Sequence, residues 1–459
     1  MTSSERHALQ QIADWSSALT FDNIPPVVRE IVRRCLIDTV GVSIPGAMTD
    51  VAKRARQVAE TVGATGKATV FGGNKQLAEP SAAFANAAAG HALDFDDNSY
   101  AGVVHGSVVV IPAAIAVAES IDASGADLLT AITAGSEAEY ALGIAATPSL
   151  YARGWWTTGV LGPVGAAAAT ARLLKLDSNA TASALGLALA GTGGAKAVFG
   201  TNGKSLLAGR SAEAGVIAAM LAARGATGPH DAAENTRGFA RLFNDSIWDQ
   251  SATAALGTRW HLIDPGIDVK RIPVCLSSHA AVDAVQDVVT THNLTVSDIH
   301  RIVCDVPPVV ATNLVYVSPR TPQEAQFSMQ FAIAASLHFG DIRLEHLTQS
   351  VVTDPDLVAT MNKVVMEVGP RWNDATARDA APEGAGVLIE THDGRLLEGF
   401  RAYPRGAALS PLSDDEIDAK FRNCAVPHLG TEATEALLKN LRDFDRLASA
   451  RDLLAALRG

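Results

Sequence analysis

The chain has 459 residues, of which 48% are hydrophobic and 19% are charged, so it exceeds one typical domain and can fill large buried cores. Its formal net charge is -12, and it has no long basic run that could follow a phosphate backbone, which argues against nucleic acid as a partner. An anionic substrate would therefore be attracted by a local basic cluster rather than by the field of the whole protein.

Cysteine usage and the N-terminal residues indicate a reduced, cytoplasmic protein. The four cysteines are far apart and match neither a zinc-ligand spacing nor a dense disulfide framework. The first residues lack a basic segment followed by an apolar one, so we expect no secretory signal. The longest apolar stretch, at 103–118, is interrupted by His105 and Pro112, and we expect no membrane span.

Helical periodicity dominates the first 260 or so residues. Apolar residues recur at helical spacing, and many helix faces carry Ala or Gly, which predicts helices packed closely on several sides. The clearest helices are expected at 27–42, 80–93, 126–142, 162–174, 180–189 and 211–223.

Strand signals begin after about residue 267. Strands are expected at 301–306 and 386–391, with a hairpin turn at Asp393-Gly394, and helices at 325–339 and 344–351 lie between them. Helices return at 413–423, where Ser413 and Glu416 form a capping box, and at 431–457. The chain is therefore predicted to be mainly α, with a large helical domain (1–266 and 404–459) and a smaller α+β lid domain (267–403).

A dense polar cluster interrupts this apolar sequence at Gly90-His-Ala-Leu-Asp-Phe-Asp-Asp-Asn98, followed by His105. If the preceding helix continues through the cluster, His91, Asp94 and Asp97 share one helix face. The flanking segments are strongly apolar, so carboxylates placed between them need partners or protons. A divalent metal is the obvious alternative, but no calcium-loop or H-E-x-x-H spacing is present.

Two Gly-rich segments fail as nucleotide-binding motifs. The segment that ends in Gly203-Lys204-Ser205 has Val198 where a P-loop requires Gly, and Gly191-Thr-Gly-Gly194 lacks the strand that a dinucleotide fingerprint needs. Lys204 and Arg210 then remain as cations near a helix start, where they suit a carboxylate ligand.

The segment from Lys270 to His279 lies where the helical region gives way to the α+β region, a position that often forms a ligand cleft. Cys275 and His279 are candidate groups there, although a lone Cys is more often a small apolar filler than a nucleophile. No G-x-S-x-G elbow accompanies them.

Taken together, these segments resemble the MmgE/PrpD family, which includes 2-methylcitrate dehydratase, cis-aconitate decarboxylase and iminodisuccinate epimerase. The resemblance runs in order through 90–97, 105–107, 203–210, 270–279 and 324–328. It implies a helical domain built from both chain ends, an α+β lid, a site in the cleft between them and a homodimer. It also implies that neither a metal nor an organic cofactor is required.

Residue by residue, the resemblance carries the family's site positions to Asp94, His105, Lys204 and Lys270. The chain departs from the family at three further positions. Asn98 replaces a Thr of the decarboxylase-like members, Trp155 replaces a His of many members, and Cys275 replaces a His of the decarboxylases and methylcitrate dehydratases. These departures leave the substrate open within the carboxylic acids.

The shared chemistry of the family is proton transfer at a carbon next to a carboxylate. We expect His105 to be the acid or base, oriented by Asp94, because imidazole titrates near neutral pH. Lys204 and Lys270 would stabilise the developing negative charge, and Arg210 is a weaker candidate for that role. Cys275 could supply a second proton.

Three functions remain open at this point. The first is a lyase, either a dehydratase or a decarboxylase, acting on a di- or tricarboxylic acid. The second is an epimerase or isomerase that uses the same proton abstraction, and Cys275 would favour it because inversion needs groups on both faces of the substrate. The third is a non-catalytic binding protein on the same fold, against which the retained Asp94, His105 and lysines argue.

Overall fold

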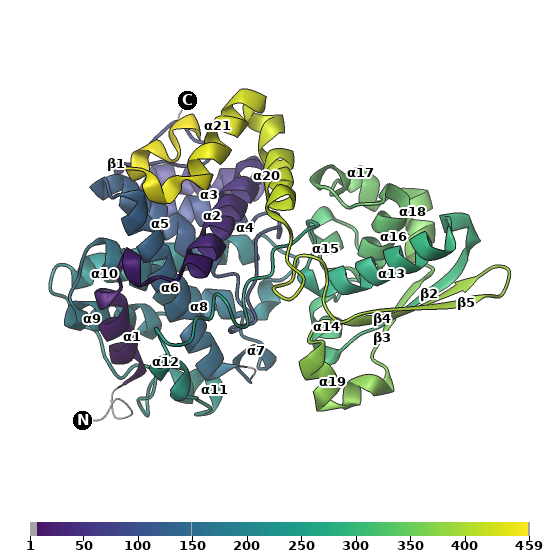
Figure 1. The fold of residues 1–459 in the computed structure, drawn as a ribbon, viewed down its shortest axis with the longest axis horizontal. Helices are drawn as coiled ribbons and strands as arrows, with labels where there is room; N and C mark the ends of the chain where they lie inside the picture. The colour runs from purple at the N-terminus through teal and green to yellow at the C-terminus, as the bar shows by residue number, and fades with distance from the viewer. Residues whose placement is uncertain (1–6, 148, 458–459) are drawn as a thin grey trace. The chain divides into compact units, whose positions relative to one another are not determined.

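The computed structural model describes residues 7–147 and 149–457. They form two compact units, which are coloured along the chain in Figure 1. Unit 1 comprises Met1–Val198, Asn202–Val269 and Ser413–Gly459, and unit 2 comprises Phe199–Thr201 and Lys270–Leu412. The C-terminal segment thus belongs to the same unit as the N-terminal half, and the changes of unit fall close to residues 270 and 412.

Unit 1 is built almost entirely from helices. They are α1 (Ala8–Ala18), α2 (Pro26–Gly46), α3 (Asp50–Val62), α4 (Glu79–His91), α5 (Ser107–Ile121), α6 (Gly125–Ala146), α7 (Ser149–Ala152), α8 (Thr157–Leu173), α9 (Ser178–Ala190), α10 (Gly203–Ala222), α11 (Phe239–Asn244), α12 (Ser251–Ala254), α20 (Asp414–Leu429) and α21 (Thr431–Arg442). The short strand β1 (Thr65–Ala68), which the sequence did not predict, is an exception to the all-helical expectation.

Small residues let the central helices of unit 1 approach closely. A Cβ atom added to Gly209 of α10 would lie 2.5 Å from the carbonyl oxygen of Phe84 in α4. At Gly215, six residues further along α10, it would lie 2.4 Å from the carbonyl oxygen of Pro163 in α8. The predicted close packing of Ala- and Gly-rich helices on several sides is confirmed, and it holds the start of α10 firmly in the unit.

Helix α10 is also long and apolar enough to cross a membrane, as its 20 residues and mean hydropathy of 1.2 allow. However, 56% of this segment is buried within the structure, and α10 packs against both α4 and α8. These features are those of a core helix, which passes the same test of length and composition.

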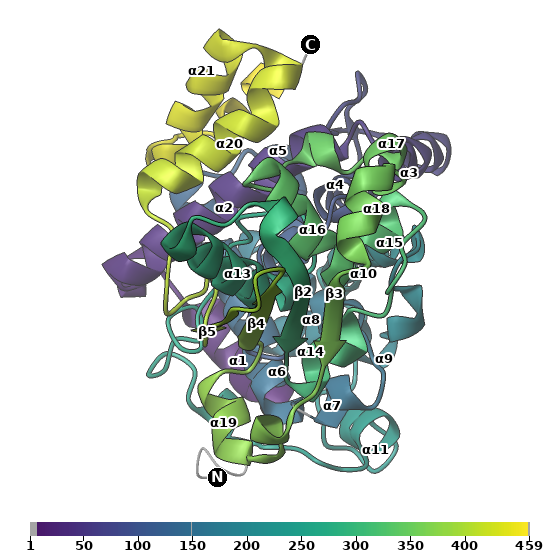
Figure 2. The same ribbon diagram turned by 90° about the vertical axis from the view of Figure 1, so that its right-hand side faces the viewer.

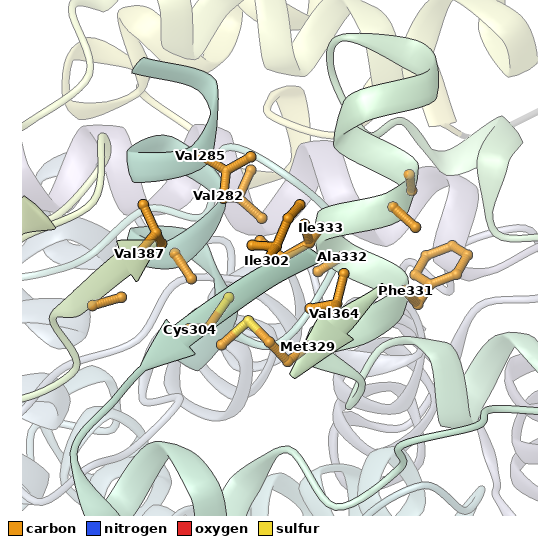
Figure 3. Packing of buried hydrophobic residues seen from close by; sticks show 14 of the residues in the cluster. Val282, Val285, Ile302, Cys304, Met329, Phe331, Ala332, Ile333, Val364 and Val387 are labelled. Carbon is orange, nitrogen blue, oxygen red and sulfur yellow. The ribbon is translucent and has the colours of Figure 1, made fainter. Parts of the chain in front are cut away.

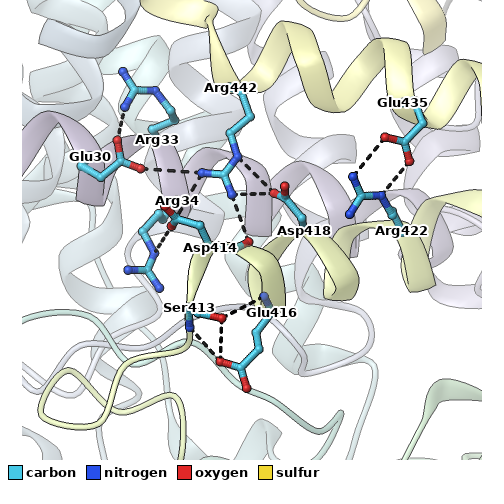
Figure 4. A network of polar contacts seen from close by, with 10 residues as sticks. All are labelled: Glu30, Arg33, Arg34, Ser413, Asp414, Glu416, Asp418, Arg422, Glu435 and Arg442. Atoms are coloured by element: carbon cyan, nitrogen blue, oxygen red, sulfur yellow. Dashed lines mark hydrogen bonds and ion pairs between the residues drawn. The ribbon is translucent and has the colours of Figure 1, made fainter.

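The C-terminal helices of unit 1 lie against α2, as Figure 1 shows for the yellow and purple segments. The predicted capping box at the start of α20 is confirmed, because Ser413 and Glu416 bond each other's backbone N–H groups. Figure 4 shows that Arg442 of α21 donates to Asp418 of α20 at 3.1 Å and lies 3.7 Å from Glu30 of α2. This network ties the end of the chain to its beginning, although each exposed pair contributes little alone.

Unit 2 contains α13 (His279–His292), β2 (Ile299–Asp305), α14 (Pro308–Asn313), α15 (Pro322–Ala325), α16 (Met329–Phe339), α17 (Gln349–Val352), α18 (Pro355–Met361), β3 (Val364–Glu367), α19 (Ala375–Ala380), β4 (Ala385–Thr391) and β5 (Leu396–Arg401). The sheet has the order β3-β2-β4-β5 (Figure 2). Strand β2 runs parallel to β3 and antiparallel to β4, and β4 and β5 form the predicted hairpin at Asp393-Gly394.

Helices α13 and α16 pack on this sheet, and their side chains form the core of unit 2 (Figure 3). Ile302 of β2, Val387 of β4 and Val364 of β3 meet Val285 of α13 and Ile333 of α16 in one buried cluster. Alternate residues of β4 are buried, as expected for a strand with one covered face. The observed elements confirm the predicted fold class, a mainly α chain with a smaller α+β unit.

Several boundaries of the predicted elements are wrong, among them that of the helix expected at 211–223, which begins at Gly203. The helix expected at 325–339 begins only at Met329, because the Ser328 side chain accepts from the backbone N–H of Phe331 and caps a new helix. The helix expected at 344–351 is a single 3-10 turn followed by the short α17. The helix expected at 431–457 ends at Arg442 and gives way to 3-10 turns.

The contact between α6 and the C-terminal segment provides a stability test. Gly125 is the first residue of α6, and its N–H donates to the carbonyl oxygen of Leu447 at 2.9 Å. A Cβ atom there would lie 1.6 Å from the carbonyl oxygen of Phe444. We predict that Gly125→Ala destabilises the protein by about 1–3 kcal/mol or more, since backbone must move to admit it.

The matched control is Gly193→Ala, because a Cβ atom at Gly193 meets no atom within 4 Å. Thermal and urea unfolding, followed by circular dichroism, measure both variants. Equal unfolding midpoints for Gly125→Ala and Gly193→Ala would show that the C-terminal segment is not docked on α6 in solution.

Candidate active site

The polar cluster lies in the loop that joins α4 to α5. Helix α4 ends at His91, and Asp94 adopts a positive φ of 49°, a left-handed conformation that Asp tolerates better than most residues. The expected continuation of the helix is therefore wrong, and His91, Asp94 and Asp97 do not share a helix face. The chain turns at Asp94, which changes the direction of every side chain that follows.

Backbone hydrogen bonds hold this loop in place. The N–H of Asn98 donates to the carbonyl oxygen of Asp268 at 2.9 Å, and the N–H of Asp268 donates back at 2.8 Å. Ser99 and Val104 are paired in the same manner, which closes the second part of the loop on itself. Val103 has a positive φ of 55°, a strained conformation for a β-branched residue that the surrounding contacts must maintain.

A lysine from the C-terminal helix also supports the loop. Lys420 of α20 donates from Nζ to the carbonyl oxygen of Phe95 at 2.8 Å and lies 4.0 Å from the centroid of the Phe95 ring. The same ammonium group pairs with Asp38 of α2 at 2.6 Å. Residues 94–97 are thus supported by α20, which lies more than 300 positions later in the chain.

The centre of the cluster is a carboxylate shared by two imidazoles. Nδ1 of His91 lies 2.9 Å from each carboxylate oxygen of Asp96, and Nδ1 of His105 lies 3.1 Å from Oδ2 of the same residue. Nδ1 of His105 also lies 3.0 Å from the backbone carbonyl oxygen of Asp97. Since a carbonyl oxygen can only accept, we assign the proton of His105 to Nδ1 and the lone pair to Nε2.

Burial sets the protonation of these groups. The His91 and Asp96 side chains are fully buried, whereas 12% of the His105 side chain is exposed. Burial lowers the pKa of His105 to about 4, against the opposing effect of Asp96 and with the help of the Lys204 cation. Burial alone would raise the pKa of Asp96, but the two imidazoles outweigh it and keep that pKa well below its usual range. At neutral pH the cluster therefore consists of a carboxylate and two neutral imidazoles.

The carboxylate that holds the His105 ring was expected to be Asp94, and this expectation is wrong in detail. The turn at Asp94 directs that side chain to Lys204, with which it forms a buried ion pair. Lys204 is the second residue of α10, and its Nζ lies 6.0 Å from the ring centroid of Trp156. Trp156 in turn stacks on His91 at a centroid distance of 5.4 Å, so the ion pair adjoins the imidazole cluster.

A second layer of carboxyl groups lies behind the loop. Burial, together with the nearby Asp38 carboxylate, raises the pKa of Asp97 to about 8. Burial likewise raises the pKa of Glu139 in α6 to about 8, with a smaller effect from Asp97. Both groups hold their protons at neutral pH, so Asp97 does not share the role of the neighbouring, ionised Asp96.

The remaining predicted residues of unit 1 lie outside this cluster. Arg210 is 69% exposed and pairs with Glu213 on the surface of α10, a location that does not support a role beside Lys204. The indole N–H of Trp155 donates to the carbonyl oxygen of Phe243 at 3.0 Å, and the two rings pack at 4.4 Å. Trp155 thus packs as an apolar side chain, and its indole N–H already has a backbone acceptor.

Three of the predicted residues, Lys270, Cys275 and His279, belong to unit 2. Lys270 is 1% exposed, and the backbone N–H of Cys275 donates to the carbonyl oxygen of Gln326 at 2.8 Å. His279 is the first residue of α13, and its Nε2 lies 3.1 Å from the carbonyl oxygen of Val274. That contact occupies one ring nitrogen of His279 with the backbone, as in a structural histidine.

Comparison with known proteins places the sequence in a family. The model of the MmgE/PrpD N-terminal domain matches residues 10–250, and that of the MmgE/PrpD C-terminal domain matches residues 272–443. The chain belongs to the MmgE/PrpD family. This match confirms the resemblance inferred from the motifs, and it extends over nearly all of the chain.

Several named proteins are similar to this MmgE/PrpD chain along its length. It is 28% identical over 442 residues to the cis-aconitate decarboxylase of Homo sapiens, which covers 93% of this chain and 89% of the relative. It is 25% identical over 479 residues to the cis-aconitate decarboxylase-like protein oryM of Aspergillus oryzae (99% and 98% covered). It is 25% identical over 478 residues to the cis-aconitate decarboxylase of Aspergillus terreus (97% and 95% covered).

Sequence reasoning missed two members of the cluster in this MmgE/PrpD protein, His91 and Asp96. Both stand in the same motif as Asp94, and the assumption of a continuous helix placed Asp94 rather than Asp96 on the side of the imidazoles.

The residue types of the cluster can also ligate metals, and the candidate ligand atoms of His91, Asp96 and His105 lie within 4.8 Å of one another. However, both Nδ1 atoms are directed at the carboxylate at hydrogen-bond distances. In addition, the carbonyl oxygen of Asp97 accepts from His105 Nδ1, which requires a proton on that nitrogen. We therefore assign the cluster to hydrogen bonding.

This assignment predicts that the purified protein contains no stoichiometric divalent metal. Exhaustive treatment with a chelator should leave the thermal unfolding midpoint unchanged, because no metal-ligand bonds contribute to the folded state. Elemental analysis and calorimetry before and after chelation measure this. A drop in the unfolding midpoint that is reversed by one equivalent of a divalent ion would instead assign the cluster to metal binding.

Proposed function

We propose that this chain is a cofactor-independent lyase that acts on a di- or tricarboxylic acid through proton transfer at the carbon next to a carboxylate. The observation that carries the proposal is the state of His105. Its Nδ1–H is directed at the carbonyl oxygen of Asp97 and the carboxylate of Asp96, which leaves Nε2 with a lone pair. A neutral imidazole held in one tautomer is suited to accept a proton at neutral pH.

The same imidazole serves both forms of the lyase reaction. In a dehydration, Nε2 takes the proton from the carbon next to the carboxylate, and the C–H electron pair forms the double bond. The imidazolium then gives this proton to the β-hydroxyl group, which leaves as water. In a decarboxylation, the C–C bond breaks with loss of CO2, and the carbon that keeps the electron pair takes a proton from Nε2, which His105 must first have gained from solvent. Asp96 supports the imidazolium in either case by accepting from Nδ1–H.

Lys204 is the proposed group that binds substrate negative charge. Its ammonium has three N–H donors, and the buried ion pair with Asp94 directs the group next to the imidazole cluster. A cation at low dielectric stabilises an enolate-like charge more strongly than a surface lysine does. We retain Lys270 of unit 2 as a second carboxylate-binding residue, on the strength of the family resemblance.

The named relatives favour decarboxylation as the first variant to test. Three of them carry the name cis-aconitate decarboxylase or cis-aconitate decarboxylase-like. An unsaturated tricarboxylic acid is therefore the first substrate class, and hydroxy di- and tricarboxylic acids are the second. The departures at Asn98, Trp155 and Cys275 are the reason for testing the wider panel.

The deciding experiment is a panel of unsaturated, hydroxy and amino di- and tricarboxylic acids incubated with the protein in D2O and followed by NMR. A lyase yields a product that has lost CO2 or water. Deuterium incorporation with retention of all carbon and oxygen atoms would mean an epimerase or isomerase instead. The proposal is refuted if no acid in the panel shows either deuterium exchange or product formation.

We predict that His105→Gln and His105→Ala fold and bind substrate but lose turnover and solvent exchange at the substrate carbon. If the reaction begins with proton abstraction, kcat/KM of the wild type should fall as the pH decreases through about 4, because protonation of His105 with its lowered pKa removes the base. As a base, His105 is unprotonated above that pH, so kcat/KM should be constant across the neutral range. A decarboxylation in which His105 delivers a proton should instead show a kcat/KM that falls as the pH rises above about 4.

The matched control for this prediction is His261→Gln. His261 is another buried imidazole of unit 1, and its Nδ1 lies 2.9 Å from a carboxylate oxygen of Glu137. Its loss should lower the unfolding midpoint but leave kcat per folded molecule unchanged. Wild-type exchange rates in folded His105→Ala would remove His105 from the chemistry.

We predict that Lys204→Ala lowers kcat/KM by a factor that corresponds to about 2–4 kcal/mol of transition-state stabilisation. Asp94→Asn should have a smaller effect, because Asp94 directs the ammonium group without contacting the reacting carbon. The control is Arg210→Ala on the same helix, which removes an exposed cation and should leave kcat/KM unchanged. Equal kcat/KM values for folded Lys204→Ala and Arg210→Ala would rule out the charge-binding role of Lys204. The kcat/KM of Lys270→Ala is measured in the same series.

A further inference from the structure

His91 is the member of the cluster that the proposed chemistry does not use. It is the last residue of α4, and its side chain is fully buried. Its ring lies 4.6 Å from the ring of His105 in an edge-on arrangement and stacks on Trp156 on another side. Among the described residues, Nε2 of His91 has no hydrogen-bond partner, so the polar contact of this imidazole is the one that Nδ1 makes with Asp96.

The geometry of that contact makes His91 and His105 competitors. Nδ1 of His91 lies 2.9 Å from both oxygens of Asp96, whereas Nδ1 of His105 lies 3.1 Å from one of them. Each N–H that a carboxylate accepts reduces the negative potential that it presents to the next donor. A second imidazole on Asp96 therefore weakens the pull of this carboxylate on a proton at His105.

We propose that His91 is a positioning residue that keeps His105 in its neutral, base-ready form by sharing the Asp96 carboxylate with it. This inference rests on the proposed function, in which His105 must be unprotonated before it meets the substrate. Without the N–H of His91, the charge of Asp96 would act on His105 alone. His105 would then hold a proton at a higher pH, and the base would be available over a narrower range.

Other charged groups near the two imidazoles also affect their pKa values. The Lys204 cation lowers the pKa of both His91 and His105, and Asp94 raises that of His91 while it pairs with Lys204. None of these groups changes when only the N–H of His91 is removed. The titratable groups that face the loop from the packed helices are Cys35 and Asp38 of α2, Glu139 and Tyr140 of α6, and Lys420 of α20.

A purely structural role for His91 makes a different prediction. His91 closes α4 and packs on Trp156, so any substitution that disturbs this packing lowers stability. It would not change the basicity of His105 in a way that depends on a hydrogen-bond donor. Two variants separate the explanations, because one keeps the ring without the donor and the other keeps the donor without the ring.

The test compares His91→Phe with His91→Asn. Phe preserves an aromatic ring against Trp156 but cannot donate to Asp96, whereas the side-chain amide nitrogen of Asn occupies the place of imidazole Nδ1 and can donate. The pKa of His105 is measured by NMR with isotopically labelled histidine, and its signal is assigned from the spectrum of His105→Gln. His91→Met removes the same donor with a flexible apolar side chain and replaces His91→Phe if that variant does not fold.

We predict that His91→Phe raises the pKa of His105 by on the order of one pH unit, while His91→Asn leaves it near the wild-type value. The acid limb of the kcat/KM profile should move by the same amount. An unchanged pKa of His105 in His91→Phe and His91→Met, or an equal rise in His91→Asn, would overturn the inference.

Failure of the proposed function is distinguishable from failure of this inference. If His105→Gln keeps full turnover, His105 is not the base, but the NMR shift in His91→Phe still reports whether the two imidazoles compete for Asp96. If His105→Gln is inactive and the shift is missing, the proposed function stands and the role of His91 is structural.

Discussion

A carboxylate that is removed from water must find hydrogen-bond donors, and Asp96 finds them in two imidazoles that come from opposite ends of one loop. This one arrangement sets the tautomers of His91 and His105 and makes the loop conformation and the charge state interdependent. Replacement of the carboxylate would leave the His91 ring without its acceptor and the His105 ring with the carbonyl oxygen of Asp97 alone. The stability of this buried charge and the orientation of the two imidazoles therefore depend on the same contacts.

The loop that carries Asp96 has little regular structure of its own and depends on its supports. Asp94 and Val103 hold left-handed backbone conformations, which persist only where surrounding contacts determine them. Those contacts come from Asp268, from Lys204 at the start of α10 and from Lys420 in α20. Strain of this kind is typical of functional loops mounted on rigid helices.

Much of the fold could be predicted from the sequence because its signals are local. Helical periodicity, the capping box of Ser413 and Glu416, and the turn at Asp393-Gly394 each act over a few residues. The distinction between Asp94 and Asp96 was lost because it depends on a single φ angle, which tertiary contacts decide. Arg210 was misplaced for a related reason, since six residues along a helix lead to a different face from that of Lys204.

The contact of Lys420 with the carbonyl oxygen of Phe95 has a consequence for the order in which the protein is made. Residues 94–97 leave the ribosome early, but their support is translated only after the whole of unit 2, near the end of the chain. Unit 2 draws nearly all its residues from one continuous segment and can collapse while synthesis continues. A nascent chain that stalls before α20 would therefore hold a complete second unit and a loop at 94–97 that still lacks one of its supports, which arrives only with the last fifty or so residues.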